Sequence, residues 1–518
     1  MHRFFEILPG ALAWGTLVLM FVLSWKLPTW VAVFIILFDI YWLLKTIYLS
    51  LHLRVAFSSM KKNLEENWIE CLKQLTIDQK QLIHGAESNV VDQMSNVNGQ
   101  WSNVFHLLIL PMYREPYEVV RESFMSLAKT NYPKDKFIVV LATEARAGGE
   151  ACAVAEKVKQ EFGGRFFKFL VTTHPADIPG EIPGKGSNET WAAHEVKRLV
   201  IDPLRLNYDN ILVSVFDVDT QVPQEYFGRL TYVFLNAPNP LRAIYQPVPL
   251  YINNIYHASV FSRIVSFSNT FWHMMQQVRP ERLRSYSSQS LPFRVLVDVG
   301  FWHTDVVSED SRIFFQGYLH YHGDFRTEPL HFPVYMDANA APTFWGTMRN
   351  LYKQIRRWGW GVENIPYMLE GFQRDPLIPK NKKWYWSFIE IEGFHSWATN
   401  SLMIFALGWL PLMLGGSHFN ESLLAYGLPR ITRFIVGLSM VGIASSAILS
   451  IMLFPPRPQG IRRRHYALYV LQWLLLPVTL IVFGAIPGLE AQTRLMLGGR
   501  FRLGFWVTPK HRIVKRES

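Results

Sequence analysis

The chain has 518 residues, of which 49% are apolar and 14% aromatic, and it carries a formal net charge of +11. This length accommodates a complete catalytic domain together with membrane segments. The charge is spread along the chain and no nucleic-acid-binding motif accompanies it, so we expect loops that face anionic lipid and no nucleic-acid partner. The two cysteines, Cys71 and Cys152, argue against a disulfide framework and permit a reducing compartment.

The amino-terminal residues predict a membrane hairpin. Two apolar stretches, 9–25 and 30–49, each approach the roughly 20 residues that cross a bilayer. The short segment 26–28 between them contains a proline and predicts a tight turn. Basic residues follow the second stretch, which places the next segment in the cytosol. We therefore assign residues 1–53 to a transmembrane hairpin and residues 54–103 to a helical linker.

Residues 104–380 have the pattern of an α/β domain. Short apolar runs that predict buried strands alternate with amphipathic segments that predict helices. The predicted strands are 106–110, 136–141, 166–172 and 210–216, and the predicted helices are 119–128, 152–162 and 186–199. This alternation indicates a largely parallel sheet covered on both faces, with ligands gathered at the carboxyl ends of its strands.

The carboxyl-terminal third returns to membrane character. Residues 381–395 are rich in aromatics and follow a group of lysines, which predicts a helix lying in the membrane interface. Residues 396–490 contain apolar stretches at 397–414, 434–454 and 466–486, and residues 491–518 form a basic tail. Five full crossings would leave this tail outside the cell, whereas its charge predicts the cytosol. We expect the stretch 466–486 to be broken or re-entrant, because Pro477 lies in its middle.

Asp217 and Asp219 form the first motif that carries chemistry. They follow a predicted buried strand, at the edge of the sheet where ligands gather. Their side chains point to the same side of an extended segment, since side chains alternate there. Carboxylate oxygens suit Mg²⁺ or Mn²⁺, which commonly retain substrate phosphate oxygens as further ligands. The pair therefore predicts a divalent metal site, although such pairs also occur in ordinary loops.

Two further motifs have matching chemistry. Glu309 and Asp310 form an acidic pair in a predicted loop, where one carboxylate would serve as a general base. The structural alternative is a solvated turn. Gln354, Arg357 and Trp358 lie on a predicted helix. An arginine fork suits a diphosphate and an indole suits the apolar face of a sugar ring, whereas the structural alternative is a cationic helix face.

The basic tail contains one more segment of interest, Phe505-Trp506-Val507-Thr508-Pro509-Lys510. As a purely interfacial segment it would place its aromatic and basic side chains at the membrane surface. As a functional loop it would bring Thr508 and Lys510 to the phosphates of a bound substrate.

In their order along the chain, these motifs resemble family-2 glycosyltransferases. The resemblance covers about residues 104–370 and the tail, and it uses Pro111-Met112-Tyr113-Arg114-Glu115-Pro116, Lys185 within 184–188, Asp217/Asp219, Glu309/Asp310 and Gln354-x-x-Arg357-Trp358. The set looks like the membrane-embedded branch that includes cellulose, chitin and hyaluronan synthases. Phe505-x-Val507-Thr508-x-Lys510 resembles the gating-loop motif of bacterial cellulose synthase. The resemblance implies a GT-A (Rossmann-like) cytosolic catalytic domain inserted between transmembrane helices.

The resemblance also implies a role for each matched residue. Asp217 and Asp219 would hold Mn²⁺ or Mg²⁺ with the donor diphosphate, and Asp310, beside Glu309, would be the catalytic base. The donor would be bound by Pro111, Tyr113, Glu115, Glu144, Lys185, Asp217, Thr508 and Lys510. Gln354, Arg357 and Trp358 would line the acceptor and pyrophosphate site. In one departure from the family, Glu144 stands near the place where an aspartate usually reads the nucleobase.

The sequence therefore predicts an inverting, metal-dependent hexosyltransferase. It would move a sugar from a nucleotide-sugar donor, expected to be UDP-linked, to a carbohydrate or lipid-linked acceptor, with polysaccharide synthesis as one outcome. The close alternative is a glycolipid glycosyltransferase that adds one sugar, because Gln-x-x-Arg-Trp also occurs in ceramide glucosyltransferases. The distant alternative is a transporter or scaffold with an inactive transferase-like domain. We expect a multi-pass protein of a bacterial plasma membrane, in contact with membrane lipids and with its catalytic domain in the cytosol.

Overall fold

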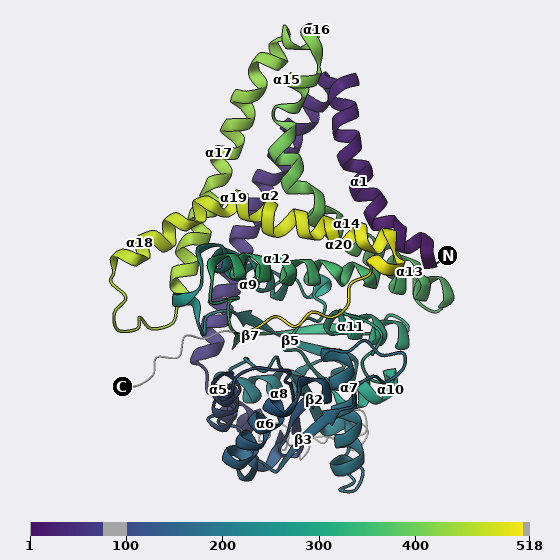
Figure 1. Cartoon of the computed structure of the whole chain (residues 1–518), viewed down its shortest axis with the longest axis vertical. Coiled ribbons are helices and arrows are strands. Elements are labelled where there is room, and N and C mark those ends of the chain that lie inside the picture. The colour runs from purple at the N-terminus through teal and green to yellow at the C-terminus, as the bar shows by residue number, and fades with distance from the viewer. Residues whose placement is uncertain (1, 76–100, 511–518) are drawn as a thin grey trace, which may run out of the picture.

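The computed structural model describes residues 2–75 and 101–510. An α/β domain forms one end of the molecule, and long helices rise from it toward the other end (Figure 1). Two ranges lie outside the described residues: 76–100, which belongs to the predicted linker, and 511–518, at the end of the basic tail.

A mixed seven-stranded sheet with the strand order β3-β2-β1-β4-β6-β5-β7 organises the α/β domain. Its strands are β1 Phe105–Pro111, β2 Phe137–Glu144, β3 Lys168–His174, β4 Ile211–Val215, β5 Ala243–Leu250, β6 Ser290–Pro292 and β7 Arg326–Tyr335. The first four strands pair in parallel, whereas β6 runs antiparallel to both β4 and β5. The predicted α/β fold is therefore confirmed, and the four predicted strands lie within a few residues of their expected positions.

Strand β1 shows why the strands of this sheet can be predicted from the sequence. Leu108 and Leu110 belong to the core on one face, and Leu107 and Ile109 belong to the core on the other. All four side chains are fully buried. Because side chains alternate along a strand, a strand covered on both faces needs an unbroken apolar run.

Helices cover both faces of the sheet. The helices of one face are α5 Tyr117–Ala128, α6 Gly149–Phe162 and α8 Tyr226–Asn236, and those of the other are α7 Lys185–Val196, α10 Phe293–Val299 and α11 Glu309–His320. The remaining helices of the domain are α9 Val260–Gln277, α12 Phe344–Gly359 and α13 Asn364–Arg374. The three helices predicted by periodicity, now α5, α6 and α7, are confirmed.

Two long helices at the amino terminus cover the two predicted apolar stretches. Helix α1 spans His2–Lys26 and α2 spans Pro28–Glu65, so Leu27 alone separates them. Among the described residues, four helical segments are long and apolar enough to cross a membrane: α1, α2, α17 (Leu423–Met452) and the run Arg464–Leu497. Helix α14 runs without a break from Lys380 to Leu407, across the boundary expected at 395/396, because no proline interrupts it. Two short helices, α15 Leu410–Leu414 and α16 Gly416–Asn420, lead from α14 to α17.

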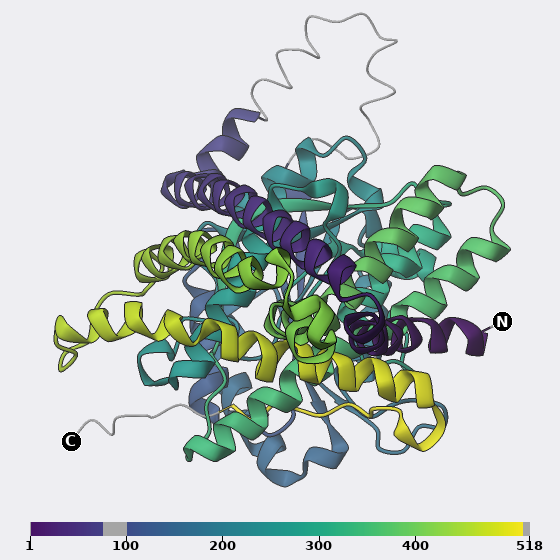
Figure 2. The same ribbon diagram turned by 90° about the horizontal axis from the view of Figure 1, so that it is seen from above.

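The run Arg464–Leu497 differs from the other long helices. It is divided into α18 Arg464–Leu471, α19 Leu476–Leu480 and α20 Ile486–Leu497, and the backbone at Phe483 is not helical. Pro477 stands in the first turn of α19, so the predicted interruption is confirmed. In Figure 1 this run lies between the rising helices and the α/β domain, and Figure 2 shows from above that it crosses the molecule from one side to the other. It packs on α12, which carries the Gln-x-x-Arg-Trp motif.

Candidate active site

The acidic segment after β4 lies at the carboxyl edge of the sheet. Beyond the end of β4, Phe216 still donates its backbone N–H to the carbonyl of Ile109 in β1, at 3.0 Å. The chain then turns, with the N–H of Thr220 bonded to the carbonyl of Asp217 at 2.8 Å. Asp217 and Asp219 therefore leave the sheet where ligands of parallel sheets gather.

Glu309 and Asp310 lie at the same edge of the sheet, on a helix that covers one of its faces. They occupy the first turn of α11, so the prediction that they lie in a loop is wrong. The carboxylate of Glu363 fixes this helix start by accepting bonds from the N–H groups of Val307 and Ser308, at 3.0 and 2.9 Å. Carboxylates in a first turn are favoured by the helix dipole. The acidic pair is thus held on a rigid element instead of a solvated turn.

Lys185 joins these two acidic segments. Its ammonium donates to both carboxylate oxygens of Asp310 at 2.9 Å and lies 3.0 Å from Oδ1 of Asp217. Burial alone would lower the pKa of Lys185, but the charges of Asp217 and Asp310 raise it well above its ordinary value. Burial likewise opposes ionisation of Asp217, yet Lys185 and then Lys510 bring its pKa below the ordinary range. The ammonium of Lys185 and the carboxylate of Asp217 are therefore charged.

Glu189 is a member of this cluster that the sequence analysis missed. It lies one helical turn after Lys185, with 3.6 Å between their charged atoms. It is fully buried, and neither of its carboxylate oxygens has a hydrogen-bond partner among the described residues. Oxygens of Glu189, Glu309 and Asp310 lie within 4.8 Å of one another. The sequence signal for Glu189 was its spacing of four residues from Lys185, at the start of a predicted helix.

The four carboxylates around Lys185 are not all ionised. Burial, and then the charge of Asp310, raises the pKa of Glu309 to about 8. Burial also raises the pKa of Glu189 well above its ordinary value. Asp310 has a raised pKa for the same first reason, but the ammonium of Lys185 opposes the shift. Burial therefore disfavours ionisation of Glu189, Glu309 and Asp310, and the ammonium of Lys185 opposes this effect.

Asp219 has different partners from Asp217. Its Oδ2 accepts from the ammonium of Lys510 at 2.7 Å and from the N–H of Asp337 at 2.9 Å. Its Oδ1 is buried without a partner among the described residues. Burial opposes the charge of Lys510, but Asp219 and Asp217 raise its pKa. A buried, unpartnered carboxylate oxygen beside a second aspartate is a donor set that fits a hard divalent cation.

The tail segment that contains Lys510 crosses the site. In Figure 1 it runs as an extended yellow trace beneath α12. A Cβ atom at Gly184 would lie only 2.5 Å from the ring of Phe505, so this ring packs directly against the backbone that precedes Lys185. The guanidinium of Arg357 lies 5.0 Å from the same ring. Thr508 is buried, and its hydroxyl has no partner among the described residues.

Helix α12 contributes the predicted Gln-x-x-Arg-Trp residues. Gln354 accepts a hydrogen bond from the side-chain amide of Asn339 at 3.0 Å. Nε of Arg357 is buried without a partner among the described residues. Trp358 lies 6.4 Å from the ring of Tyr251 and packs against the apolar cluster that contains Phe483. The motif therefore connects the acidic cluster with the run Arg464–Leu497 above it.

Four of the residues predicted to bind the donor lie at or just beyond the ends of β1 and β2. Pro111 ends β1. The carboxylate of Glu115 accepts from the N–H of Tyr113 at 2.7 Å, and burial raises the pKa of Glu115. Glu144 is buried and forms an ion pair with Arg146, whose guanidinium lies 4.8 Å from the ring of Tyr113. Arg146, which the sequence analysis did not single out, stands between Glu144 and Tyr113.

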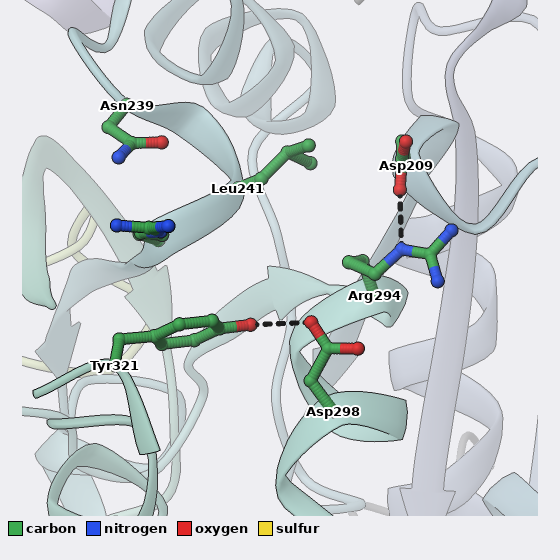
Figure 3. Close-up of a pocket in the computed structure, with 7 residues that line it drawn as sticks. Asp209, Asn239, Leu241, Arg294, Asp298 and Tyr321 are labelled. Carbon is green, nitrogen blue, oxygen red and sulfur yellow. Dashed lines mark hydrogen bonds and ion pairs between the residues drawn. The ribbon is translucent and has the colours of Figure 1, made fainter. Parts of the chain in front are cut away.

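A surface cavity of about 420 Å³ lies elsewhere on the domain (Figure 3). Its lining includes Asp209, which precedes β4, and Arg294, which pairs with Asp209 at 2.7 Å. Tyr321 donates to Asp298 across the same cavity at 2.8 Å. These charges satisfy one another, and Asp209 lies at the amino end of β4, opposite the edge that carries Asp217. The cavity is separate from the candidate site.

No protein-family model matches the chain, and no curated protein matches it. Among solved structures, the chain is similar to the mannosyltransferase PcManGT from Pyrobaculum calidifontis in complex with GDP-Man and Mn²⁺, at 13% identity, 67% coverage of this chain, 86% coverage of that chain and a TM-score of 0.38. It is also similar to S. aureus TarS 1–349 in complex with UDP-GlcNAc, at 12% identity, 68% and 93% coverage and a TM-score of 0.36.

Proposed function

We propose that this protein is a membrane-embedded inverting glycosyltransferase that uses a nucleotide-sugar donor. The observation that carries the proposal is the placement of Lys185 between Asp217 and Asp310 at the carboxyl edge of the sheet. A transferase needs a site for the donor diphosphate next to a base for the acceptor hydroxyl. Here, one buried ammonium links the residues proposed for those two tasks. The ordered motifs that resemble family-2 enzymes agree with this assignment.

The proposed reaction is a single displacement. Asp310 accepts the proton of the acceptor hydroxyl while that oxygen forms a bond to the anomeric carbon of the donor sugar. The bond from this carbon to the donor phosphate breaks on the opposite face, and the nucleoside diphosphate leaves. Lys185, Lys510 and Arg357 supply positive charge around the leaving group, where fixed cations act strongly because water is excluded.

Asp217 and Asp219 are the residues that would hold Mn²⁺ or Mg²⁺. The bound cation would neutralise charge on the donor diphosphate. The buried, unpartnered Oδ1 of Asp219 supports this assignment. Thr508 and Lys510 of the tail would complete the donor site, together with Tyr113, and Glu144 would act through Arg146.

The acceptor is proposed to be a carbohydrate or a lipid-linked sugar, and one observation favours a lipid-linked acceptor that receives a single sugar. Trp358, the proposed acceptor-binding residue, packs against the cluster of Phe483, Leu351 and Ile355. Phe483 belongs to the broken run Arg464–Leu497, which would therefore obstruct a polymer that left the site past Trp358. A lipid-linked acceptor enters from the side and needs no such exit. Polysaccharide synthesis is the other outcome, and product length on a gel separates the two.

The membrane arrangement is part of the proposal. The apolar helices α1, α2 and α17, together with α14, would cross the bilayer, and the run Arg464–Leu497 would lie in its interface. The α/β domain and the tail would then share the cytosolic side of a bacterial plasma membrane. The proposed organisation keeps a hairpin at 1–53, the linker 54–103, a catalytic domain at 104–380 and the tail 491–518.

The test is a donor screen. Detergent-solubilised full-length protein is incubated with Mn²⁺ or Mg²⁺ and a panel of UDP- and GDP-sugars, and nucleotide release is measured. We expect release from at least one donor, its loss in excess EDTA and its recovery when the cation is restored. Asp217→Asn serves as the inactive control. The absence of release from every donor would contradict the transferase assignment, and full activity in EDTA would contradict the metal assignment alone.

A further inference from the structure

The amino-terminal turn of α1 contains a buried carboxylate with an unusual set of partners. Glu6 is only 2% exposed. It pairs with Arg3 at 2.8 Å, with His2 at 3.2 Å and with Arg502, which belongs to the tail segment beyond α20. A buried carboxylate requires such compensation, because an unpaired charge is costly to bury. The pair Glu6–Arg502 therefore connects the two ends of the described chain.

Arg3 contributes to the same contact between the start of α1 and the end of α20, which we call the joint. Its guanidinium donates to the carbonyl of Leu495 at 3.0 Å and to the carbonyl of Met496. These are among the last carbonyls of α20, which lack partners within the helix itself. Gly498 follows with a φ of +66°, and a Cβ there would lie 2.6 Å from Nη1 of Arg3. The start of α1 thus caps α20 and fixes the direction in which the tail leaves it.

The tail that begins at this joint ends in the candidate active site. Phe505 packs on Gly184 and under Arg357, and Lys510 reaches Asp219. The residues between Arg502 and Lys510 form no helix or strand, so no backbone ladder sets their course. Side-chain contacts must set it instead, at Phe505 and at the two ends of the segment. Lys510 is the anchor inside the site, and Arg502 is the anchor at the joint.

We propose that Glu6 is a positioning residue for the donor site, which it serves by holding Arg502 and, through it, the tail that brings Phe505 and Lys510 to Asp219. This inference depends on the proposed function only for the identity of the ligand. Glu6 touches neither substrate nor reacting atoms. It fixes the origin of a segment that has no helix or strand of its own, and this lowers the entropy lost when that segment is ordered in the donor site.

The experiment uses full-length protein in detergent and compares Glu6→Gln, Arg502→Gln and the double variant. Arg500→Gln is the matched control, because Arg500 lies in the same segment and contacts the ring of Phe501 but forms no ion pair among the described residues. Two quantities are measured: the rate of trypsin cleavage after Lys510, and the affinity for UDP or GDP in the presence of Mn²⁺.

We expect each single variant to speed cleavage after Lys510 and to weaken nucleotide binding by about tenfold, the lower end for loss of a hydrogen bond between charged groups. The double variant should be no worse than the worse single variant, since both break one pair. Arg500→Gln should behave as wild type. Wild-type cleavage and affinity in Arg502→Gln, whose half-exposed side chain can be changed without unfolding α1, would overturn the proposal.

A second comparison separates positioning from a general structural role. In a full-length Phe505→Ala/Lys510→Ala background, Glu6→Gln should cause no further loss of nucleotide affinity, because the tail no longer contributes to it. A further loss there would show that Glu6 acts through α1 and would overturn the proposal. The cleavage assay needs no donor, so it reports on the joint even if the transferase assignment fails. Conversely, normal transfer by Glu6→Gln would refute the positioning role while leaving the transferase assignment intact.

Discussion

Lys185 holds Asp310 with two hydrogen bonds of equal length, 2.9 Å to each carboxylate oxygen, while the same ammonium lies 3.0 Å from Asp217. The proposed base and the proposed donor-binding carboxylate are thus coupled by one side chain that is 8% exposed. Removal of this ammonium would leave the partly buried carboxylates of Asp217 and Asp310 without their shared cation, and breaking a buried ion pair in this way is strongly destabilising.

Lys185→Met should therefore destabilise the protein as well as inactivate it. We expect the free energy of unfolding to fall by about 3 kcal/mol, the lower end for breaking a buried pair. Thermal unfolding in detergent measures the change. Lys197→Met is the matched control on the same face of the domain, since its pairing with Asp202 at 2.7 Å is solvent-exposed and worth about 0.5 kcal/mol. Equal stability of the two variants would mean that the cluster tolerates its unpaired carboxylates.

Asp310→Asn and Asp217→Asn should fail in different ways. Asparagine at 310 keeps the size of the side chain but cannot accept the acceptor proton, so transfer should fall by about 10²–10⁴-fold with donor affinity nearly unchanged. Asparagine at 217 should weaken binding of the nucleoside diphosphate itself. Calorimetry with UDP or GDP and Mn²⁺, beside transfer rates, distinguishes the roles. Wild-type turnover by Asp310→Asn would place the base elsewhere.

The strands were predictable because a sheet covered on both faces leaves continuous apolar runs, such as the buried residues of β1. The start of α11 was not, because acidic residues in a first helical turn resemble those of a loop. What fixes that start is the carboxylate of Glu363, more than fifty residues away, bonded to Val307 and Ser308. Local sequence does not contain such a long-range contact.

The residues of the candidate site likewise divide into those that local sequence predicts and those that it does not. The residues that matched a motif, among them Lys185 and Asp310, come together in the structure. Glu189 belongs to no motif, and its importance comes from complete burial, which a helical pattern alone does not specify. Arg146 was missed because only the fold brings it over Tyr113, although it stands two residues after its ion-pair partner Glu144 in the sequence.

Glu309 predicts a dependence of stability on pH. Burial, and then the charge of Asp310, raises its pKa from 4.5 to about 8 in the folded protein. Between these values the folded state holds a proton that the unfolded chain releases. The free energy of unfolding should therefore fall as pH rises from about 5 to about 8, and this contribution should level off above that. Glu309→Gln, which cannot ionise, should flatten the slope in melts across this range. An unchanged slope would assign the dependence to another group.

The contacts of Arg3 and Glu6 with the α20–tail joint predict membrane sidedness. The start of α1 and the tail must lie on one side, and the α1–α2 turn at Leu27 on the other. In a protein with Cys71 and Cys152 replaced by serine, cysteines at His2 and Arg500 should resist an impermeant thiol reagent in intact cells and react after lysis. A cysteine at Leu27, which is 48% exposed, should react in intact cells. Different behaviour of the His2 and Arg500 positions would contradict the shared side.

Gly184 gives the most direct test of the tail in the donor site. Its φ of 162° is ordinary extended backbone, so alanine is not strained by conformation there. The obstacle is Phe505, whose Cγ and Cβ would lie 2.5 and 2.8 Å from the added methyl group. Gly184→Ala should therefore push Phe505, and with it Lys510, away from the site. Overpacking typically costs 1–3 kcal/mol, so nucleotide affinity should fall by about tenfold.

Two companion variants make this test specific to the contact. Phe505→Ala removes the ring that the methyl group meets, so adding it to Gly184→Ala should cause no further loss, and the two effects should not add. Gly164→Ala controls for the substitution itself, because no atom lies within 4 Å of its Cβ position. If the losses from Gly184→Ala and Phe505→Ala were additive, the two residues would act independently, and the tail would not pack on Gly184 when nucleotide is bound.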